Sequence, residues 1–141
     1  MIKRNFKILK VDHIAIATLS SEKMNYFLEN VIGLECVLEE KIESEKVKVS
    51  KFSLKNLNIE VLNPISKDSP ISNYLKKQKT GVHHICLLVD NIKEAILYFK
   101  SNKIGVIYDT PRLGAMGKLV TFLNPKDTNG ILIEISQNSL S

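Results

Sequence analysis

Apolar residues recur along the chain in two kinds of spacing, and the same succession of spacings occurs twice. Runs of strand length, rich in β-branched residues, cover residues 10–17 and 82–90. Each run is followed by apolar residues at helical spacing, over residues 21–31 and 92–101. Three further strands are predicted after each helix, at about 34–41, 46–54 and 57–63, and again at about 105–109, 118–123 and 130–136. The pattern therefore predicts two β-α-β-β-β repeats.

Matching residues support this internal repeat. The matched segments, separated by roughly 70–74 positions, are Asp12-His13-Ile14 with His83-His84-Ile85, Tyr26-Phe27 with Tyr98-Phe99, Gly33 with Gly105, Phe52 with Phe122, and Asn58–Val61 with Leu132–Ile135. We therefore expect a single domain over residues 1–141. Its parts are repeat one at about 8–64, a linker at about 65–81 with a short helix around 71–77, and repeat two at about 82–137.

The composition is that of an ordinary globular domain and excludes disordered and fibrous classes. The 141 residues are 44% hydrophobic and 25% charged. The apolar runs are far shorter than the roughly 18–20 residues that a membrane span needs. No apolar segment of a signal peptide follows the basic residues 1–7. Two cysteines, Cys36 and Cys86, are too few for a disulfide scaffold. We expect a cytoplasmic protein with two buried thiols.

The charge balance is moderately basic. Lys and Arg number 20 against 15 Asp and Glu, which gives a formal net charge of +5. The lysines are scattered, and no basic stripe with interleaved aromatic residues is present, so nucleic acid is not an expected partner. A basic surface is compatible with an anionic small molecule.

Four predicted strands carry one ionisable residue on the face turned away from the helices. Successive strand side chains alternate between faces. In strand 57–62, Ile59 and Val61 form the apolar face that packs on the helix, which leaves Glu60 on the other face. The same alternation in all four strands selects His13, Glu60, His84 and Glu134.

This set of side chains indicates a divalent metal site. A carboxylate in the middle of an apolar strand is costly to bury without a partner. Two imidazoles and two carboxylates that converge on one face offer nitrogen and oxygen ligands to a first-row ion, and cobalt, nickel, manganese, iron and zinc all remain candidates. His83 aligns with Asp12 and is expected to face the helices, and Cys86 is expected to be a small wall residue.

At this point the residues resemble those of the vicinal-oxygen-chelate superfamily and, within it, the methylmalonyl-CoA epimerase family. The resemblance covers roughly residues 10–137. The matching segments are Val11–Ala17, Ile59–Pro64, Asp68–Ile71, Gly81–Cys86, Pro111–Lys118, Phe122–Asp127 and Gly130–Glu134.

The resemblance implies an α+β fold, in which two βαβββ repeats form a curved mixed sheet and a metal-holding half-barrel cup. It implies a metal-dependent isomerase that interconverts the two C2 epimers of methylmalonyl-CoA, a step of propionate metabolism. It also implies a homodimer with one divalent ion per chain, Co²⁺ first and Ni²⁺, Mn²⁺ or Zn²⁺ as alternatives. By resemblance His13, Glu60, His84 and Glu134 hold the ion, and Glu134 is also a catalytic base.

Two further features of the implied site are less determined by the sequence. A second proton-transfer group is expected near strand 47–52, where Lys48, Glu43 and Glu45 are all candidates. The loop that ends in Gly117 and Lys118 offers backbone N–H groups and an ammonium to the substrate carboxylate or the CoA phosphates, and it also reads as a simple turn between strands.

Two other functions remain as alternatives. Lactoylglutathione lyase uses a similar His/Glu set, but the Asp68–Ile71 and Gly117-Lys118 segments fit that family less well. A non-enzymatic binding member of the superfamily is the other alternative, and the complete set of four ligands argues against it.

Overall fold

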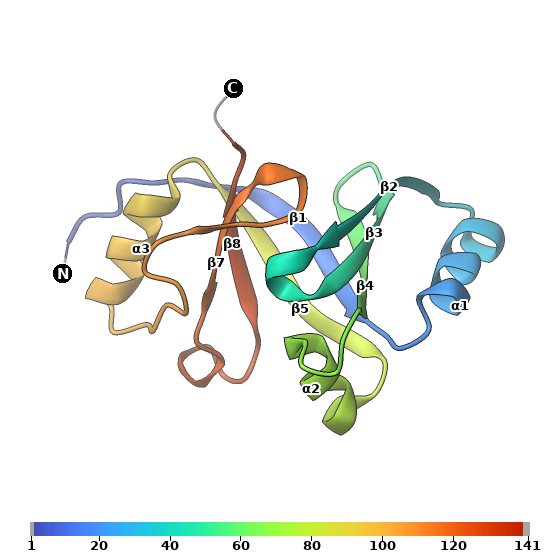
Figure 1. The fold of residues 1–141 in the computed structure, drawn as a ribbon. Coiled ribbons are helices and arrows are strands. Elements are labelled where there is room, and N and C mark those ends of the chain that lie inside the picture. Colours follow the sequence, from blue (N-terminus) through green and yellow to red (C-terminus); the bar gives the residue numbers. More distant parts are fainter. Residues whose placement is uncertain (1, 140–141) are drawn as a thin grey trace. The chain divides into compact units, whose positions relative to one another are not determined.

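The computed structural model describes residues 2–139, which form two compact units (Figure 1). One unit is His13–His83. The other combines the residues up to Asp12 with those from His84 onward. The chain passes from one unit to the other within β1 (Ile8–Ala17) and within β5 (Gly81–Val89). The two predicted histidine ligands, His13 and His84, are the first residues after these two crossings.

In the unit His13–His83, the strands follow the order β2-β3-β4-β1. They comprise β1, β2 (Glu35–Ile42), β3 (Val47–Ser53) and β4 (Asn58–Pro64). β1 and β4 are parallel, and the other neighbours are antiparallel. The parallel pair needs a crossover connection, which the intervening helix and strands provide.

Two helical segments belong to the same unit. Helix α1 (Ser21–Tyr26) continues as a π-helix, Phe27–Ile32, which ends at Gly33 with φ of 89°. This left-handed conformation suits glycine. Leu28 of this segment packs on Phe52 and Val61, the apolar face of the strands. Helix α2 (Pro70–Gln78) begins at the cap residue Ser69, whose hydroxyl accepts a hydrogen bond from the Ile71 N–H.

In the second unit the strand order is β5-β8-β7-β6, with β6 (Arg112–Leu113), β7 (Leu119–Leu123) and β8 (Ile133–Gln137). β5 and β8 are parallel, and the other pairs are antiparallel. Helix α3 (Ile92–Ser101) is capped by Asn91 and buries Ile92, Ala95 and Ile96. The core residues of this unit are Phe6, Val89, Ile92, Ala95, Ile96, Leu123 and Ile135.

The predicted α+β class and the two βαβββ successions are confirmed, but one predicted strand is wrong. Residues 105–109 form no strand, and Val106 makes a single bridge to Leu123. The Thr121 hydroxyl accepts a hydrogen bond from the Tyr108 N–H and donates one to the Tyr108 carbonyl. A side chain therefore replaces the backbone partner that a ladder needs, and strand pairing resumes at β6.

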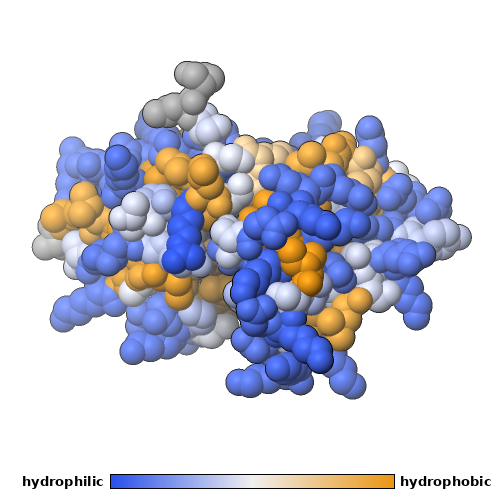
Figure 2. Space-filling view, viewed as in Figure 1, coloured by the Kyte–Doolittle hydropathy of each residue, from blue (hydrophilic) through white to orange (hydrophobic). Residues whose placement is uncertain are grey.

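The surface of the molecule can be compared with what the sequence predicts. Hydrophilic side chains cover most of the face seen in Figure 2, with apolar patches between them. No helix within residues 2–139 combines the length and the apolar content required to cross a bilayer.

Neither cysteine is in a disulfide. Cys86 is buried as expected. Cys36 is half-buried instead, because it lies on β2, an edge strand that has a neighbouring strand on one side only.

Candidate metal centre

Two His/Glu pairs are buried on strands, one pair in each unit. In the unit His13–His83, β1 and β4 run in parallel, and Ala15 is the register partner of Glu60. His13 Nδ1 lies 3.1 Å from Glu60 Oε2, and both residues are only 5% exposed. Ile59 and Val61, on either side of Glu60, pack toward the π-helix. The predicted assignment of faces is therefore correct for this strand.

The second pair lies on the equivalent strands of the other unit. β5 and β8 run in parallel, and Cys86 is the register partner of Glu134. His84 Nε2 lies 3.6 Å from Glu134 Oε1, within ion-pair distance and beyond a good hydrogen bond. Both residues are buried. Ile135, next to Glu134, belongs to the core under α3, so that Glu134 takes the opposite face as predicted.

The chemistry of these donors suits a divalent metal ion. Each pair offers an imidazole nitrogen and a carboxylate oxygen, the ligands that first-row ions accept. His13, His84 and Glu134 are all buried, and each can provide one ligand atom. A bound divalent cation would supply positive charge to these two buried carboxylates, whose burial is otherwise costly.

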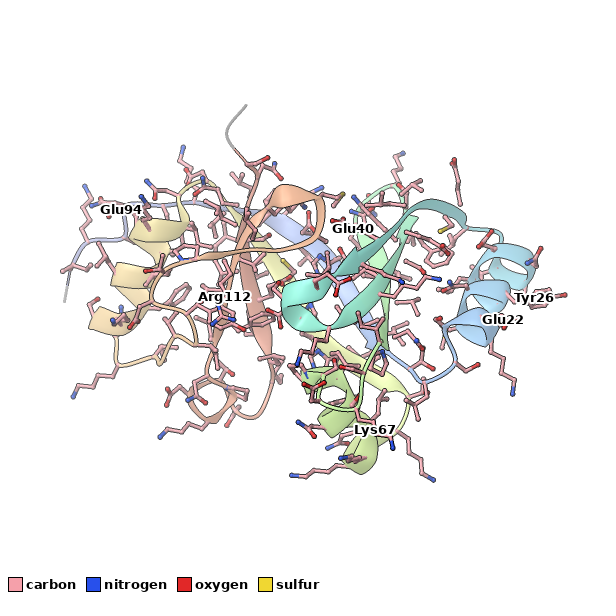
Figure 3. All side chains as sticks on the ribbon, in the orientation of Figure 1. Glu22, Tyr26, Glu40, Lys67, Glu94 and Arg112 are labelled. Carbon is pink, nitrogen blue, oxygen red and sulfur yellow. The ribbon has the colours of Figure 1, made fainter. Side chains whose placement is uncertain are left out.

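The second pair is supported by an aromatic row on the same face. Phe122 is the register partner of Glu134, and its ring contacts the His84 ring edge-on, with the centroids 5.6 Å apart. Tyr108 contacts Phe122 in turn, at 6.3 Å. The guanidinium of Arg112 lies 3.9 Å from the centre of the Tyr108 ring (Figure 3). This row holds the imidazole in place and brings an exposed cation to the Glu134 face.

The structure also places the residues next to the two predicted histidine ligands. The His83 ring contacts the Tyr74 ring of α2, with the centroids 4.8 Å apart, and this contact agrees with the predicted helix-facing orientation. The Cys86 thiol lies 3.1 Å from the Ser136 hydroxyl. Cys86 is fully buried, and its sulfur is therefore hydrogen-bonded within the wall of the site.

Lys118 makes a contact that sequence reasoning missed. Its Nζ donates to Asp12 Oδ1 at 2.7 Å, and the two side chains are 14% and 4% exposed. Lys118 follows the short 3₁₀ turn Ala115–Gly117, in which Met116 and Gly117 have φ of 59° and 68°. The expected ammonium is therefore present next to the turn, but it is paired with an acid 106 positions away. The sequence signal was a carboxylate, Asp12, inside an apolar strand.

The strand register separates Lys48, one of the three candidates for the second proton-transfer group, from Glu60. Lys48 pairs in register with Asn63, so that it lies on the face opposite Glu60. Its Nζ is 3.7 Å from Glu39 Oε2. Glu43 and Glu45 lie in the 3₁₀ turn Glu43–Glu45 between β2 and β3. The residues that share the face of Glu60 on these strands include Lys51 and Glu40.

Comparisons with known proteins agree with this arrangement. The family model described as Glyoxalase/Bleomycin resistance protein/Dioxygenase superfamily matches residues 12–122. A curated relative, the mitochondrial methylmalonyl-CoA epimerase of Bos taurus, is 39% identical over 129 residues, which are 91% of this chain and 74% of the relative. The ethylmalonyl-CoA/methylmalonyl-CoA epimerase of Cereibacter sphaeroides is 36% identical over 91% of this chain and 97% of its own length.

Solved structures are similar over nearly the whole chain. A methylmalonyl-CoA epimerase in complex with methylmalonyl-CoA and NH₄⁺ has a TM-score of 0.86 at 28% identity, and the match covers 94% of this chain and 96% of that one. The methylmalonyl-CoA epimerase of Mycobacterium tuberculosis, 21% identical, has a TM-score of 0.92 over 99% and 94% of the two chains. The folds are therefore the same.

Proposed function

The chain belongs to the glyoxalase/bleomycin resistance/dioxygenase superfamily and, within it, to the methylmalonyl-CoA epimerases, and we propose from this premise that it interconverts (R)- and (S)-methylmalonyl-CoA. One observation carries the proposal: each of the two repeats holds a buried His/Glu pair, and the two pairs lie on equivalent strands. Such pairs suit an ion that polarises a carbonyl oxygen, and the substrate has a carbonyl on the carbon next to C2.

We infer that His13, Glu60, His84 and Glu134 together hold one divalent ion, with Co²⁺ as the first candidate. The donor set of two nitrogens and two oxygens supports this choice, and Ni²⁺, Mn²⁺ and Zn²⁺ accept the same ligands. When bound, the ion supplies positive charge that favours loss of the C2 proton. The twofold repetition of the pair in the sequence is the further support for a common site.

We propose Glu134 as the catalytic base. The C2 proton is acidic because a thioester and a carboxylate flank the carbon. A Glu134 carboxylate oxygen accepts this proton, and a group on the opposite side of C2 returns one. Burial excludes water from Glu134 and keeps the transferred proton near the carbon. The ring of Phe122 contacts the His84 imidazole edge-on next to this carboxylate.

The substrate's anionic groups are best matched by the cations around the turn Ala115–Gly117. Arg112 is exposed and lies on the Glu134 face, and so we assign it to a carboxylate or phosphate of the CoA thioester. Gly117 provides the backbone for close approach, with its left-handed φ of 68°. Lys118 contributes positive potential from its place beside Asp12.

The domain organisation, the oligomeric state and the cellular setting complete the proposal. We propose that both repeats form a single vicinal-oxygen-chelate domain, since the family match spans them. The protein is proposed to act as a homodimer in the cytoplasm, in propionate metabolism, with neither nucleic acid nor a membrane as a partner.

Deuterium exchange at C2 tests the reaction directly. Cobalt-loaded and chelator-stripped protein are each incubated with methylmalonyl-CoA in D₂O, and deuterium at C2 is followed by mass spectrometry against a protein-free control. We expect rapid exchange only with the loaded protein. Absence of exchange by a protein with bound cobalt would refute the epimerase proposal, and the hemithioacetal of glutathione would then be the next substrate to assay.

A further inference from the structure

A lysine stands directly across the sheet from one of the proposed metal ligands. β3 and β4 are antiparallel, and Lys51 is the register partner of Glu60. Directly opposed residues of antiparallel strands project to the same face, with their Cβ atoms about 4.5–5.5 Å apart. The half-buried Lys51 side chain therefore leaves the backbone beside the buried Glu60 carboxylate.

The same face of the sheet carries other ionisable side chains near Lys51. The His13 imidazole lies 3.1 Å from Glu60 on the side of β1, away from β3. On the other side, β2 contributes Leu38 opposite Lys51, and Glu40 two residues farther along β2, opposite Val49. Glu40 extends from β2 in Figure 3. Lys51 therefore has the proposed ligand Glu60 directly opposite it on β4 and the acid Glu40 diagonally across on β2.

The charge of the proposed centre explains why an ammonium at this position matters. Two carboxylate ligands cancel the charge of a divalent ion, and a neutralised ion attracts electrons from the substrate carbonyl less strongly. A positive charge next to one carboxylate draws electron density from it and restores part of the ion's field. The ammonium also repels the metal ion and competes with the ion for the carboxylate oxygens.

We propose that Lys51 is a positioning residue that sets the charge of the metal centre through Glu60, so that the site binds its ion less tightly and polarises its substrate more strongly. This inference rests on the proposed function, because it requires Glu60 to be a ligand. It assigns to Lys51 no contact with the substrate. The other lysine of β3, Lys48, cannot act in this way, because it lies on the opposite face of the strand.

Co²⁺ affinity of the chelator-stripped, full-length protein is the direct readout. Lys51→Met removes the charge and keeps the length of the side chain, and Lys48→Met is the matched control on the other face. We expect Lys51→Met to lower the Kd for Co²⁺ about tenfold, the size expected for one charge near the site. Lys48→Met leaves the Kd within about threefold, and Lys51→Arg, which keeps the charge, leaves it close to that of the wild type.

A double-mutant cycle distinguishes action through Glu60 from a general change of charge. In a Glu60→Gln background, the carboxylate on which Lys51 acts is gone, so Lys51→Met should change the Kd by less than about threefold. Thermal melts of the stripped proteins establish that each variant is folded. With saturating Co²⁺, Lys51→Met should also lower the rate of C2 exchange, and Lys51→Arg should restore it.

Two results would overturn the inference. One is a Kd for Lys51→Met that matches that of Lys48→Met. The other is an equal effect of Lys51→Met with and without Glu60. Either result leaves the epimerase proposal intact, since that proposal stands or falls on C2 exchange by the wild-type protein. Failure of the wild-type protein to bind Co²⁺ would instead overturn the metal centre itself.

Discussion

At the scale of single residues, the two buried glutamates have different surroundings. Glu60 has His13 on one side and the Lys51 position on the other. Glu134 is bordered by Cys86 and Phe122, which bring no charge to it. The proposed role of Glu134 as the base is tested by a substitution that keeps the shape of its side chain.

Glu134→Gln should therefore abolish proton transfer while the fold is retained. The amide preserves the shape of the side chain and removes the basic oxygen, so C2 exchange should fall by about 10²–10⁴-fold. The measurement is deuterium incorporation at saturating Co²⁺, with Glu22→Gln on α1 as an exposed control. Full exchange activity in Glu134→Gln would exclude it as the base.

The adjacent histidines provide a second test at this scale. His84 shares a face with Glu134, and His83 contacts Tyr74 of α2 instead. His84→Ala should weaken Co²⁺ binding at least tenfold, the effect expected when a ligand is lost, whereas His83→Ala should leave it nearly unchanged. Calorimetric titration of the stripped proteins measures both. Equal losses in the two variants would show that the assignment of faces is wrong.

The buried ion pair of Lys118 with Asp12 predicts an effect on stability. Lys118→Met removes the cation and leaves the nearly inaccessible Asp12 carboxylate without this partner. Breaking a buried pair in this way costs about 3 kcal/mol in the free energy of unfolding. Urea denaturation measures the loss, and Lys126→Met, at an exposed lysine, is the control. A loss no larger than that of the control would show that the pair does not stabilise the fold.

Sequence reasoning found the His/Glu residues because each stands alone among apolar neighbours of a strand and recurs in the second repeat. Alternation alone was enough to assign their faces. Asp12 with Lys118 could not be found in this way, because the partners are 106 positions apart and no periodicity links them. Lys51 could not be assigned either, since its position opposite Glu60 depends on the register of β3 and β4.

At the scale of elements, the sequence predicts the strands that have regular backbone partners. The strands that overlap their predicted ranges are β1, β2, β3, β4, β5, β7 and β8. Prediction fails at residues 105–109, where the Thr121 hydroxyl takes the place of a backbone partner of Tyr108. The apolar spacing at 21–31 predicts a helix correctly, but it does not reveal that the second half of the helix, Phe27–Ile32, is a π-helix.

The start of α2 depends on one hydroxyl. The fully buried Ser69 Oγ accepts from the Ile71 N–H at 3.2 Å and also donates to the Glu45 carbonyl at 3.3 Å. Ser69→Ala should destabilise the protein by about 1–2 kcal/mol, the cost of losing a helix cap. The hydroxyl of Ser72 donates to the Ser66 carbonyl in an exposed position, so Ser72→Ala should lower the free energy of unfolding by less. Equal unfolding midpoints in urea for the two variants would contradict this role for Ser69.

At the scale of the whole molecule, the proposed ligands are divided equally between the two units. Each unit contributes one His/Glu pair, and each pair lies on a parallel pair of strands. Under the proposal above, the ion takes its ligands from both pairs and so binds the native state in preference to the unfolded chain. Ligand binding of this kind stabilises the native state by mass action.

Removal of the ion should accordingly lower the melting temperature of the whole protein. Free Co²⁺ at about 100 times its Kd adds about 2.7 kcal/mol to the free energy of unfolding. Differential scanning calorimetry of loaded and chelator-treated protein measures this difference. His13→Ala and His84→Ala should each lose about half of it or more at the same Co²⁺ concentration, because a tenfold higher Kd leaves the ion at only about 10 times Kd. An undiminished difference in either variant would show that its histidine is not a ligand.

The passage of the chain between units has a consequence for biosynthesis. Residues 13–83 are contiguous, so that unit has its complete sequence as soon as residue 83 has left the ribosome. The other unit is discontinuous: the Lys7 N–H bonds to Asp90, 83 positions later, and Phe6 packs in a core completed only by Ile135. Because chains emerge from the N-terminus onward, Phe6 is synthesised well before Ile135, which belongs to the same core. The complete sequence of residues 13–83 is therefore available before Phe6 has the core that buries it.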